Sequence, residues 1–170
     1  MTFDNTIADY LYTFTKKIMA LPNIYTRETS DVIISRIHQL HINTPAKWGK
    51  MNVAQMLAHC NVTYEMVYEN KHPKPNAFLR FILKAMVKPT VVNEKPYAHN
   101  SRTAPAFLIV DAREFEKEKK RLVEYIAKTQ HLGSAYFEGR ESHSFGKLSA
   151  AEWNNMFYKH LHHHLSQFGV

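Results

Sequence analysis

The stretch Tyr158–Val170, YKHLHHHLSQFGV, places four histidines among apolar residues at the end of the chain. At about 100° per residue, one side of a helix through this region is apolar and includes Trp153, Met156, Phe157, Leu161 and Phe168. His160 and His164 lie in the middle of that stripe, whereas His162 points to the opposite side and His163 lies on the flank. Imidazoles four residues apart leave the same helix face and can bind one metal ion. Two buried histidines that hydrogen bond to their neighbours are the alternative interpretation.

The composition is typical of one globular domain. A chain of 170 residues is long enough to bury a substantial core, and it has 45% apolar residues, 22% charged residues and only five glycines. The low glycine content favours helices over a turn-rich β fold. No stretch of about 18 apolar residues is present to span a membrane. The N-terminus lacks the continuous apolar segment of a signal peptide, which predicts a cytoplasmic protein.

The charge pattern argues against nucleic acid and membrane partners. The net charge is +7 and the pI is about 9.4, but the basic residues are dispersed. The run from Glu116 to Arg121 mixes both signs, as expected for a solvent-facing helix. The single cysteine, Cys60, excludes an internal disulfide and any multi-cysteine metal site, and is interpreted as a buried thiol.

Three amphipathic helices are predicted in the first half of the chain. Apolar residues recur at three and four positions over residues 4–20, which predicts a helix that ends near Pro22 and packs on the rest as an extra element. A second helix begins with Thr29 or Ser30 as its N-cap and ends before Pro45. Asn52 and Gln55 form a capping pair for a third helix that reaches about Asn70. His59 lies at the edge of the apolar stripe of this third helix.

The second half of the chain alternates helices and loops. Residues 76–88 predict a short apolar and basic helix that packs on the core. Residues 89–105 predict a long ordered loop or an edge strand, and several of its polar residues could line the mouth of a pocket: Asn93, Glu94, Lys95, Tyr97, His99, Asn100 and Arg102. Residues 106–110 form a short apolar run whose secondary structure the pattern does not decide.

Two further helices follow. Asp111 with Glu114 is predicted to cap a helix to about Gln130, closed by Gly133. A second loop then carries His131 and His143. Ser149 with Glu152 forms a capping box for the last helix. No internal repeat and no linker divides the chain.

Four blocks of the sequence resemble a known family. WGKMNVAQMLAHC (48–60), VVNEKPYAHNSRTAP (91–105), HSFGKLSAAEW (143–153) and YKHLHHHLSQFG (158–169) together resemble a bacterial family of unknown function in the DinB/YfiT-like superfamily. The likeness runs from about Thr29 to the C-terminus. It implies an all-α fold, a four-helix bundle with long loops over residues 29–170. Residues 1–28 lie outside the likeness and are expected, from their periodicity, to form an N-terminal helical extension packed on the bundle.

The resemblance also implies a metal site. His59 matches the first ligand, His160 and His164 match an H-x3-H pair, and Gln167 stands at the place of a common downstream glutamine. His162 stands where relatives more usually have an acid, which matters little if that position faces solvent. Three neutral imidazoles leave coordination positions open, as in catalytic sites. Zn²⁺ and Ni²⁺ suit imidazole best, and Fe and Mn stay open.

The functions that the resemblance implies are those of thiol-dependent S-transferases and metal-dependent hydrolases. In the first, the ion ionises a low-molecular-weight thiol that attacks a small-molecule substrate. In the second, the ion activates water, and His143 or Glu94 serves as proton shuttle. Both residues have an alternative role on a loop surface or behind the site. A non-catalytic metal-binding or stress-related protein is the alternative function, and a homodimer is compatible with a small bundle.

Overall fold

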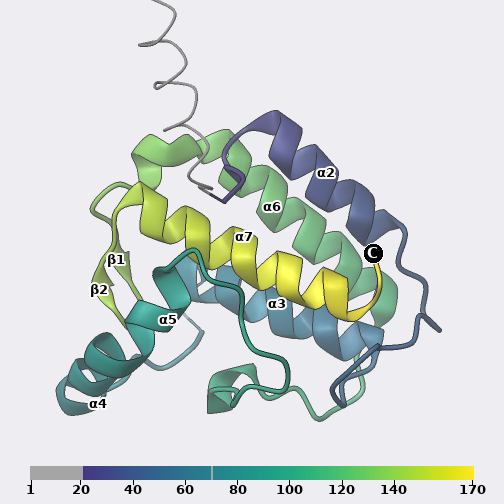
Figure 1. Ribbon diagram of the computed structural model, residues 1–170, viewed down its shortest axis with the longest axis horizontal. Coiled ribbons are helices and arrows are strands. Elements are labelled where there is room, and N and C mark those ends of the chain that lie inside the picture. Colours follow the sequence, from purple (N-terminus) through teal and green to yellow (C-terminus); the bar gives the residue numbers. More distant parts are fainter. Residues whose placement is uncertain (1–20, 70) are drawn as a thin grey trace, which may run out of the picture.

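The described part of the chain, residues 21–69 and 71–170 of a computed structural model, is mostly helical (Figure 1). The helix predicted over residues 4–20 lies outside the described residues. The elements in order are α2 (Arg27–His38), α3 (Val53–Tyr68), α4 (Ala77–Ile82), the π-helix η1 (Leu83–Val87), α5 (Lys88–Val92), the 3-10 helix η2 (Pro105–Phe107), α6 (Phe115–Phe137), β1 (Glu141–Ser142), β2 (Gly146–Lys147) and α7 (Ala150–Gln167). None of the described helices has the length and apolar character needed to cross a membrane.

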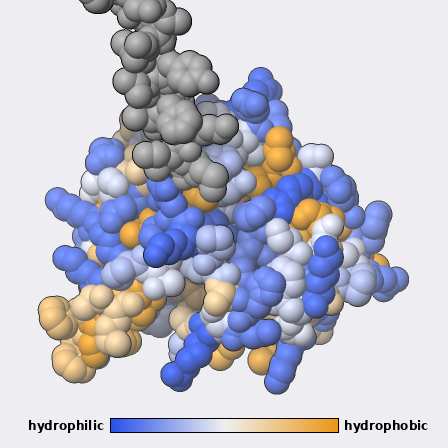
Figure 2. Space-filling model, in the orientation of Figure 1, coloured by the Kyte–Doolittle hydropathy of each residue, from blue (hydrophilic) through white to orange (hydrophobic). Residues whose placement is uncertain are grey.

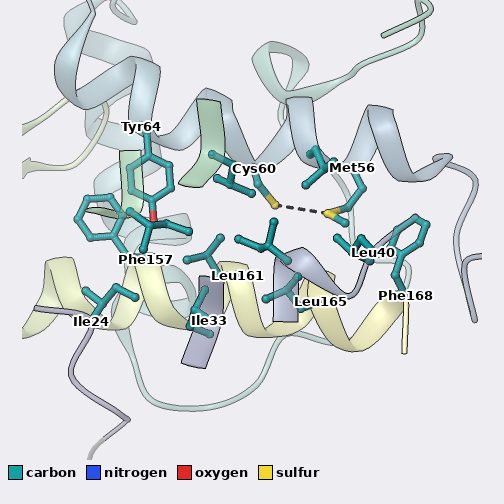
Figure 3. Close-up of a cluster of buried hydrophobic side chains, with 14 of the residues drawn as sticks. Ile24, Ile33, Leu40, Met56, Cys60, Tyr64, Phe157, Leu161, Leu165 and Phe168 are labelled. Atoms are coloured by element: carbon teal, nitrogen blue, oxygen red, sulfur yellow. Dashed lines mark hydrogen bonds between the residues drawn. The ribbon is translucent and has the colours of Figure 1, made fainter. Parts of the chain in front are cut away.

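The four long helices share one core. α3 packs on α6, α2 packs on α6, and α7 contacts α2, α3 and α6. Figure 3 shows the side chains that fill the space between them, among them Ile33, Leu40, Met56, Tyr64, Phe157, Leu161 and Leu165. Cys60 lies in this core as a buried thiol, as predicted, with its Sγ atom 3.8 Å from Met56 Sδ. The burial of Cys60 raises the pKa of its thiol.

The helices that carry the candidate histidines begin at the predicted caps. Asn52 accepts a hydrogen bond from the backbone N–H of Gln55, whose side chain accepts one from the backbone of Asn52. Ser149 and Glu152 form the same reciprocal pair at the start of α7. Each box satisfies two backbone donors that a helix start leaves unpaired, which fixes the register of both helices.

The start of α2 differs from the prediction. The helix begins at Arg27, because Thr26 rather than Thr29 or Ser30 is the N-cap and accepts a hydrogen bond from the Thr29 N–H. The chain is already tied to the core before this point, since Ile24 is fully buried and its N–H donates to Asn154 Oδ1 at 2.7 Å.

The predicted start of α6 is also wrong. The helix begins at Phe115, with Glu114 as an N-cap that makes no side-chain capping bond, while Asp111 pairs with Arg113 at 3.0 Å. Gly133 interrupts the helix with a φ of 69°, as its predicted closing role requires, but the chain turns helical again to Phe137. Burial of the Phe137 ring against Trp153 and Phe157 accounts for this last turn. The following segment forms the antiparallel hairpin β1–β2, which periodicity did not reveal.

The helical arm over residues 77–92 does not bury its apolar residues. It starts at the Asn76 cap, continues through η1 and ends at Val92, beyond the predicted limit at residue 88. Phe78, Phe81 and Met86 are 74%, 69% and 74% exposed, and no residue of α4, η1 or α5 is buried. The hydrophobic colours at the lower left of Figure 2 lie over this arm. The prediction that it packs on the core is therefore wrong for most of its apolar side chains, and the edge strand considered for residues 89–105 does not form.

Candidate metal centre

Three imidazole rings from two antiparallel helices converge in one place. His59 comes from α3, and His160 and His164 come from α7, one turn apart. One ring nitrogen of each residue lies within 4.8 Å of the others. The Nε2 atoms of His59 and His160 are 2.9 Å apart, and the rings of His59 and His164 have centroids 4.4 Å apart. The structure thus brings together the three residues that the sequence suggested as metal ligands.

Hydrogen bonds on the far side of two rings fix their tautomers. The Nδ1–H of His59 donates to the carbonyl oxygen of Phe107 at 2.9 Å. The Nδ1–H of His164 donates to Gln167 Oε1 at 2.8 Å, because the Nε2 of Gln167 is committed to the Trp48 carbonyl at 2.7 Å. A neutral imidazole with a proton on Nδ1 has its lone pair on Nε2. Two of the three rings therefore present Nε2 as an acceptor or ligand atom.

The third ring can take either tautomer. Nδ1 of His160 lies 3.0 Å from the hydroxyl of Thr63, which can donate or accept. If Thr63 donates, His160 Nε2–H bonds to His59 Nε2 and the cluster is closed without an ion. If His160 Nδ1–H donates to Thr63, three Nε2 lone pairs face one another and a cation is needed between them. If the Thr63 hydroxyl rotates and the His160 proton moves from Nε2 to Nδ1, the three histidines change from a hydrogen-bonded cluster into a set of metal ligands.

The donor set fits a divalent ion of the zinc type. Two imidazole nitrogens bound to a tetrahedral Zn²⁺ lie about 3.3 Å apart, since each bond is about 2.0–2.1 Å. The Nε2 atoms of His59 and His160 are 2.9 Å apart, and one ring nitrogen of each histidine lies within 4.8 Å of the others, so small movements would bring the three to that spacing. Each ring is also held from behind by a backbone carbonyl, an amide or a hydroxyl, which is the second layer of contacts that metal-binding histidines usually have.

Burial keeps all three rings neutral at neutral pH. It lowers the pKa of His59, and it lowers the pKa of His164 to about 3, with the His59 ring adding to the effect. The pKa of His160 lies well below its ordinary value because of burial and the neighbouring imidazoles of His164 and His59. Protons therefore compete weakly with a metal ion for these nitrogens.

Gln167 is positioned by a glycine that the sequence left unexplained. A Cβ atom at position 49 would lie 2.5 Å from Gln167 Nε2, and the φ of Gly49 is +83°. Glycine is the residue that adopts this backbone conformation without strain and leaves room for the amide. Gly49 and the Trp48 carbonyl thus hold the side chain that orients His164.

Sequence reasoning missed the contacts behind the other two rings. Helical spacing places Thr63 beside His59 on α3, but its contact with His160 depends on how α3 packs on α7. The Phe107 carbonyl belongs to η2, in a run whose conformation was ambiguous. No side-chain pattern could have identified a backbone acceptor there.

A cavity of about 1250 Å³ adjoins the three histidines. α3, α7, the α4–α5 arm and the loop before α6 form its wall. The wall is mostly apolar and includes Met66, Val67, Leu83, Val91, Phe107 and Met156. A ligand in this cavity has direct access to the candidate metal centre.

The remaining candidate residues are placed differently. His143 lies in the cavity wall, with Nδ1 3.0 Å from Ser144 Oγ and Nε2 3.4 Å from the His72 carbonyl. Glu94 is exposed and lies outside this cavity, beside a smaller hollow next to Lys159. His162 faces solvent, as the helical wheel predicted, and contacts Arg36 at 3.1 Å.

Comparison with known proteins places the chain in a family. Residues 25–169 match the model of a family described as a protein of unknown function, DUF1569. The comparison with curated proteins gave no match. The comparison with solved structures gave none either. The match includes α3 and α7, with all three histidines and the residues that orient them, and it covers most of the sequence, so the chain belongs to the DUF1569 family.

Proposed function

We propose that this protein is a divalent-metal-dependent enzyme of the DinB/YfiT-like type. In this proposal α2, α3, α6 and α7 are the helices of a four-helix bundle, and His59, His160 and His164 hold Zn²⁺ or Ni²⁺. The observation that carries the proposal is the pair of hydrogen bonds by which His59 Nδ1 and His164 Nδ1 donate to fixed acceptors. These bonds leave the Nε2 atoms of both rings for an ion.

The chemistry follows from the donor set and its surroundings. A divalent ion held by three neutral imidazoles keeps positions for an exogenous ligand and supplies Lewis acidity that lowers the pKa of a thiol or a water molecule. The chain itself orients the rings through Thr63, Phe107 and Gln167, and mostly apolar walls line the adjoining cavity. The product of such a site is an S-substituted thiol or a hydrolysed small molecule, depending on which nucleophile binds.

Proton transfer in the hydrolytic version is assigned to His143. This histidine lies in the wall of the same cavity, at the end beyond the three histidines, where its Nε2 atom is 3.4 Å from the His72 carbonyl, so it would serve a substrate that extends to that end. Glu94 is the weaker candidate, because its exposed carboxylate lies outside the cavity.

Metal analysis of the purified chain tests the proposal. The wild-type protein is expected to bind about one Zn²⁺ or Ni²⁺ per chain, and His160→Ala to bind the ion at least about 100-fold more weakly, since even the loss of a supporting contact costs 10- to 100-fold. His162→Ala is the matched control, because His162 lies on the solvent face of the same helix. Mass spectrometry of metal content and calorimetric titration measure both. Stoichiometric metal in folded His160→Ala, or none in the wild type, would contradict the assignment.

A non-catalytic metal-binding protein is the second candidate, because an ion bound by these residues would link α3 to α7. Removal of metal with a chelator separates the two. We expect the metal-free chain to keep its helical circular dichroism and a cooperative thermal transition, since the buried side chains of Tyr64, Phe157 and Leu161 already join the two helices. Structural zinc domains, by contrast, unfold without their ion. Loss of helical signal on chelation would favour the structural role.

A further inference from the structure

The cavity beside the histidines is elongated along two helices. Its lining on α3 runs from Gln55 to Val67, and its lining on α7 runs from Trp153 to Gln167. At 1.5 Å per residue these spans are about 18 and 21 Å. The volume of about 1250 Å³ is above the usual range for small-molecule sites. The ligand space is therefore much longer than the three-histidine cluster requires.

The two ends of this cavity differ in chemistry. α3 and α7 are antiparallel, because His59 meets His164 while Tyr64 stacks on Phe157. At one end Lys50, Gln55 and Gln167 add polar groups to the side chains of Trp48 and Met51. Beyond the histidines in the other direction, α3 contributes Met66 and Val67, and α7 contributes Met156 and Trp153. This apolar part extends about 12 Å along α3 from His59 to Val67.

The helical arm completes the apolar part. Leu79, Leu83, Val87 and Val91 line the cavity from α4, η1 and α5, and α5 packs against α7 (Figure 1). The polar side chains at this end already have partners, because His72 Nε2 lies 2.7 Å from Glu65 Oε2 and His143 contacts Ser144. The walls beyond the histidines thus offer little besides apolar contact.

We propose that the ligand of this cavity is a small molecule with an elongated apolar part, of the alkyl or acyl class. Its chain lies along Met66, Val67 and Met156 and under the helical arm, and its functional group lies at the three histidines. The position of the ligand's functional group rests on the proposed function. The binding of the ligand's alkyl chain rests on the apolar cavity alone, so the two can be tested separately.

Straight-chain alcohols test the binding of an alkyl chain, because they carry neither a charge nor a metal-chelating group. We expect hexanol, octanol and decanol to displace the neutral fluorescent probe 1-aminoanthracene, with about fourfold tighter binding per added methylene. The compact 1-adamantanol should bind at least about tenfold more weakly than decanol. Equal binding of the compact and linear alcohols, or affinity that does not change with chain length, would overturn the proposal.

Two substitutions on one π-helix locate the site. Leu83→Trp places an indole on the cavity side and should weaken decanol binding at least about tenfold, whereas Met86→Trp on the exposed side should leave it unchanged. Val91→Trp, on the cavity side of α5, is the second blocking variant if Leu83→Trp fails to fold. Equal effects of the cavity-side and exposed variants would contradict the location.

The same titration in His160→Ala and in chelator-treated wild type separates this inference from the metal proposal. Chain-length-dependent binding without metal supports the apolar site even if the three histidines bind no ion. Normal metal content together with no alcohol binding overturns the apolar site and leaves the metal centre in place.

Discussion

Arg121→Ala should lower the free energy of unfolding by about 3–5 kcal/mol at pH 7, the cost of removing one partner from a buried ion pair. The Arg121 guanidinium on α6 lies between two carboxylates. Nη1 donates to Glu118 Oε2 at 2.8 Å, and Nη2 donates to Glu65. The side chains of Glu65 and Glu118 are only 8% and 5% exposed. Without the guanidinium, two buried carboxylates are left close together with fewer cationic partners.

The size of this loss should depend on pH. Burial opposes the ionisation of Glu65, but hydrogen bonds from Lys71, Arg121 and His72 outweigh it and lower the pKa of the carboxyl below its ordinary value. In the wild type the resulting stability is present above the ordinary pKa of about 4.5 and is lost as the pH falls through the lowered pKa. In Arg121→Ala, Lys71 and His72 still hydrogen bond to Glu65, but the pKa of its carboxyl is lowered less, so the difference between the two proteins should shrink as the pH falls from 7 to 4, below the ordinary pKa.

Urea unfolding followed by circular dichroism at both pH values measures the effect. Lys120→Ala is the matched control, because Lys120 and its partner Glu124 are 78% and 63% exposed and 3.9 Å apart. The control should change stability by less than about 0.5 kcal/mol. Similar losses for the two variants would show that the Arg121 pairs contribute no more than surface ion pairs do.

Phe157→Ala should cost about 3–5 kcal/mol of unfolding free energy, the usual range for an aromatic side chain removed from a core. The Phe157 ring is fully buried. It stacks on Tyr64 with centroids 5.1 Å apart and an interplanar angle of 4°, and it meets Phe137 edge-on at 5.4 Å. The substitution therefore leaves a cavity where α3, α6 and α7 meet.

The neighbouring Tyr158→Ala is the control, because it shows how much any aromatic-to-alanine substitution in α7 changes the stability. Tyr158 is half-buried and stacks on the solvent-facing His162 at 5.7 Å. We expect a loss of about 1 kcal/mol or less from this variant. Guanidinium unfolding measures both proteins, and a loss below about 1 kcal/mol for Phe157→Ala would contradict tight packing of the aromatic cluster.

Local rules were sufficient for the helices that carry the site. The capping pairs Asn52–Gln55 and Ser149–Glu152 depend on side chains three residues apart, so the sequence shows them directly. The inward direction of His160 and His164 follows from the helical period. The meeting of His59 with this pair is a contact across about a hundred residues, which periodicity does not encode. It was expected only from the family resemblance.

Contacts that depend on tertiary packing escaped prediction. The Phe107 carbonyl behind His59 and the backbone at Gly49 have no side-chain signature. The arm over residues 77–92 has the composition of a packed helix, yet its large side chains face solvent or the cavity. Hydrophobicity alone cannot distinguish a core from a binding wall, because both need apolar residues.

The helical arm over residues 77–92 affects how a ligand reaches the histidines. α5 is held to α7, because Lys159 Nζ donates to the Thr90 carbonyl and Asn155 donates to the Val92 carbonyl. α4 and η1 have no buried residue, so their local unfolding breaks few interactions and costs a small part of the total stability. Amide hydrogens in α4 and η1 therefore exchange with solvent faster than those of α3 and α7. The rate at which molecules enter and leave the cavity is then governed by this weakly held segment, independently of the tightly packed helices that hold the imidazoles.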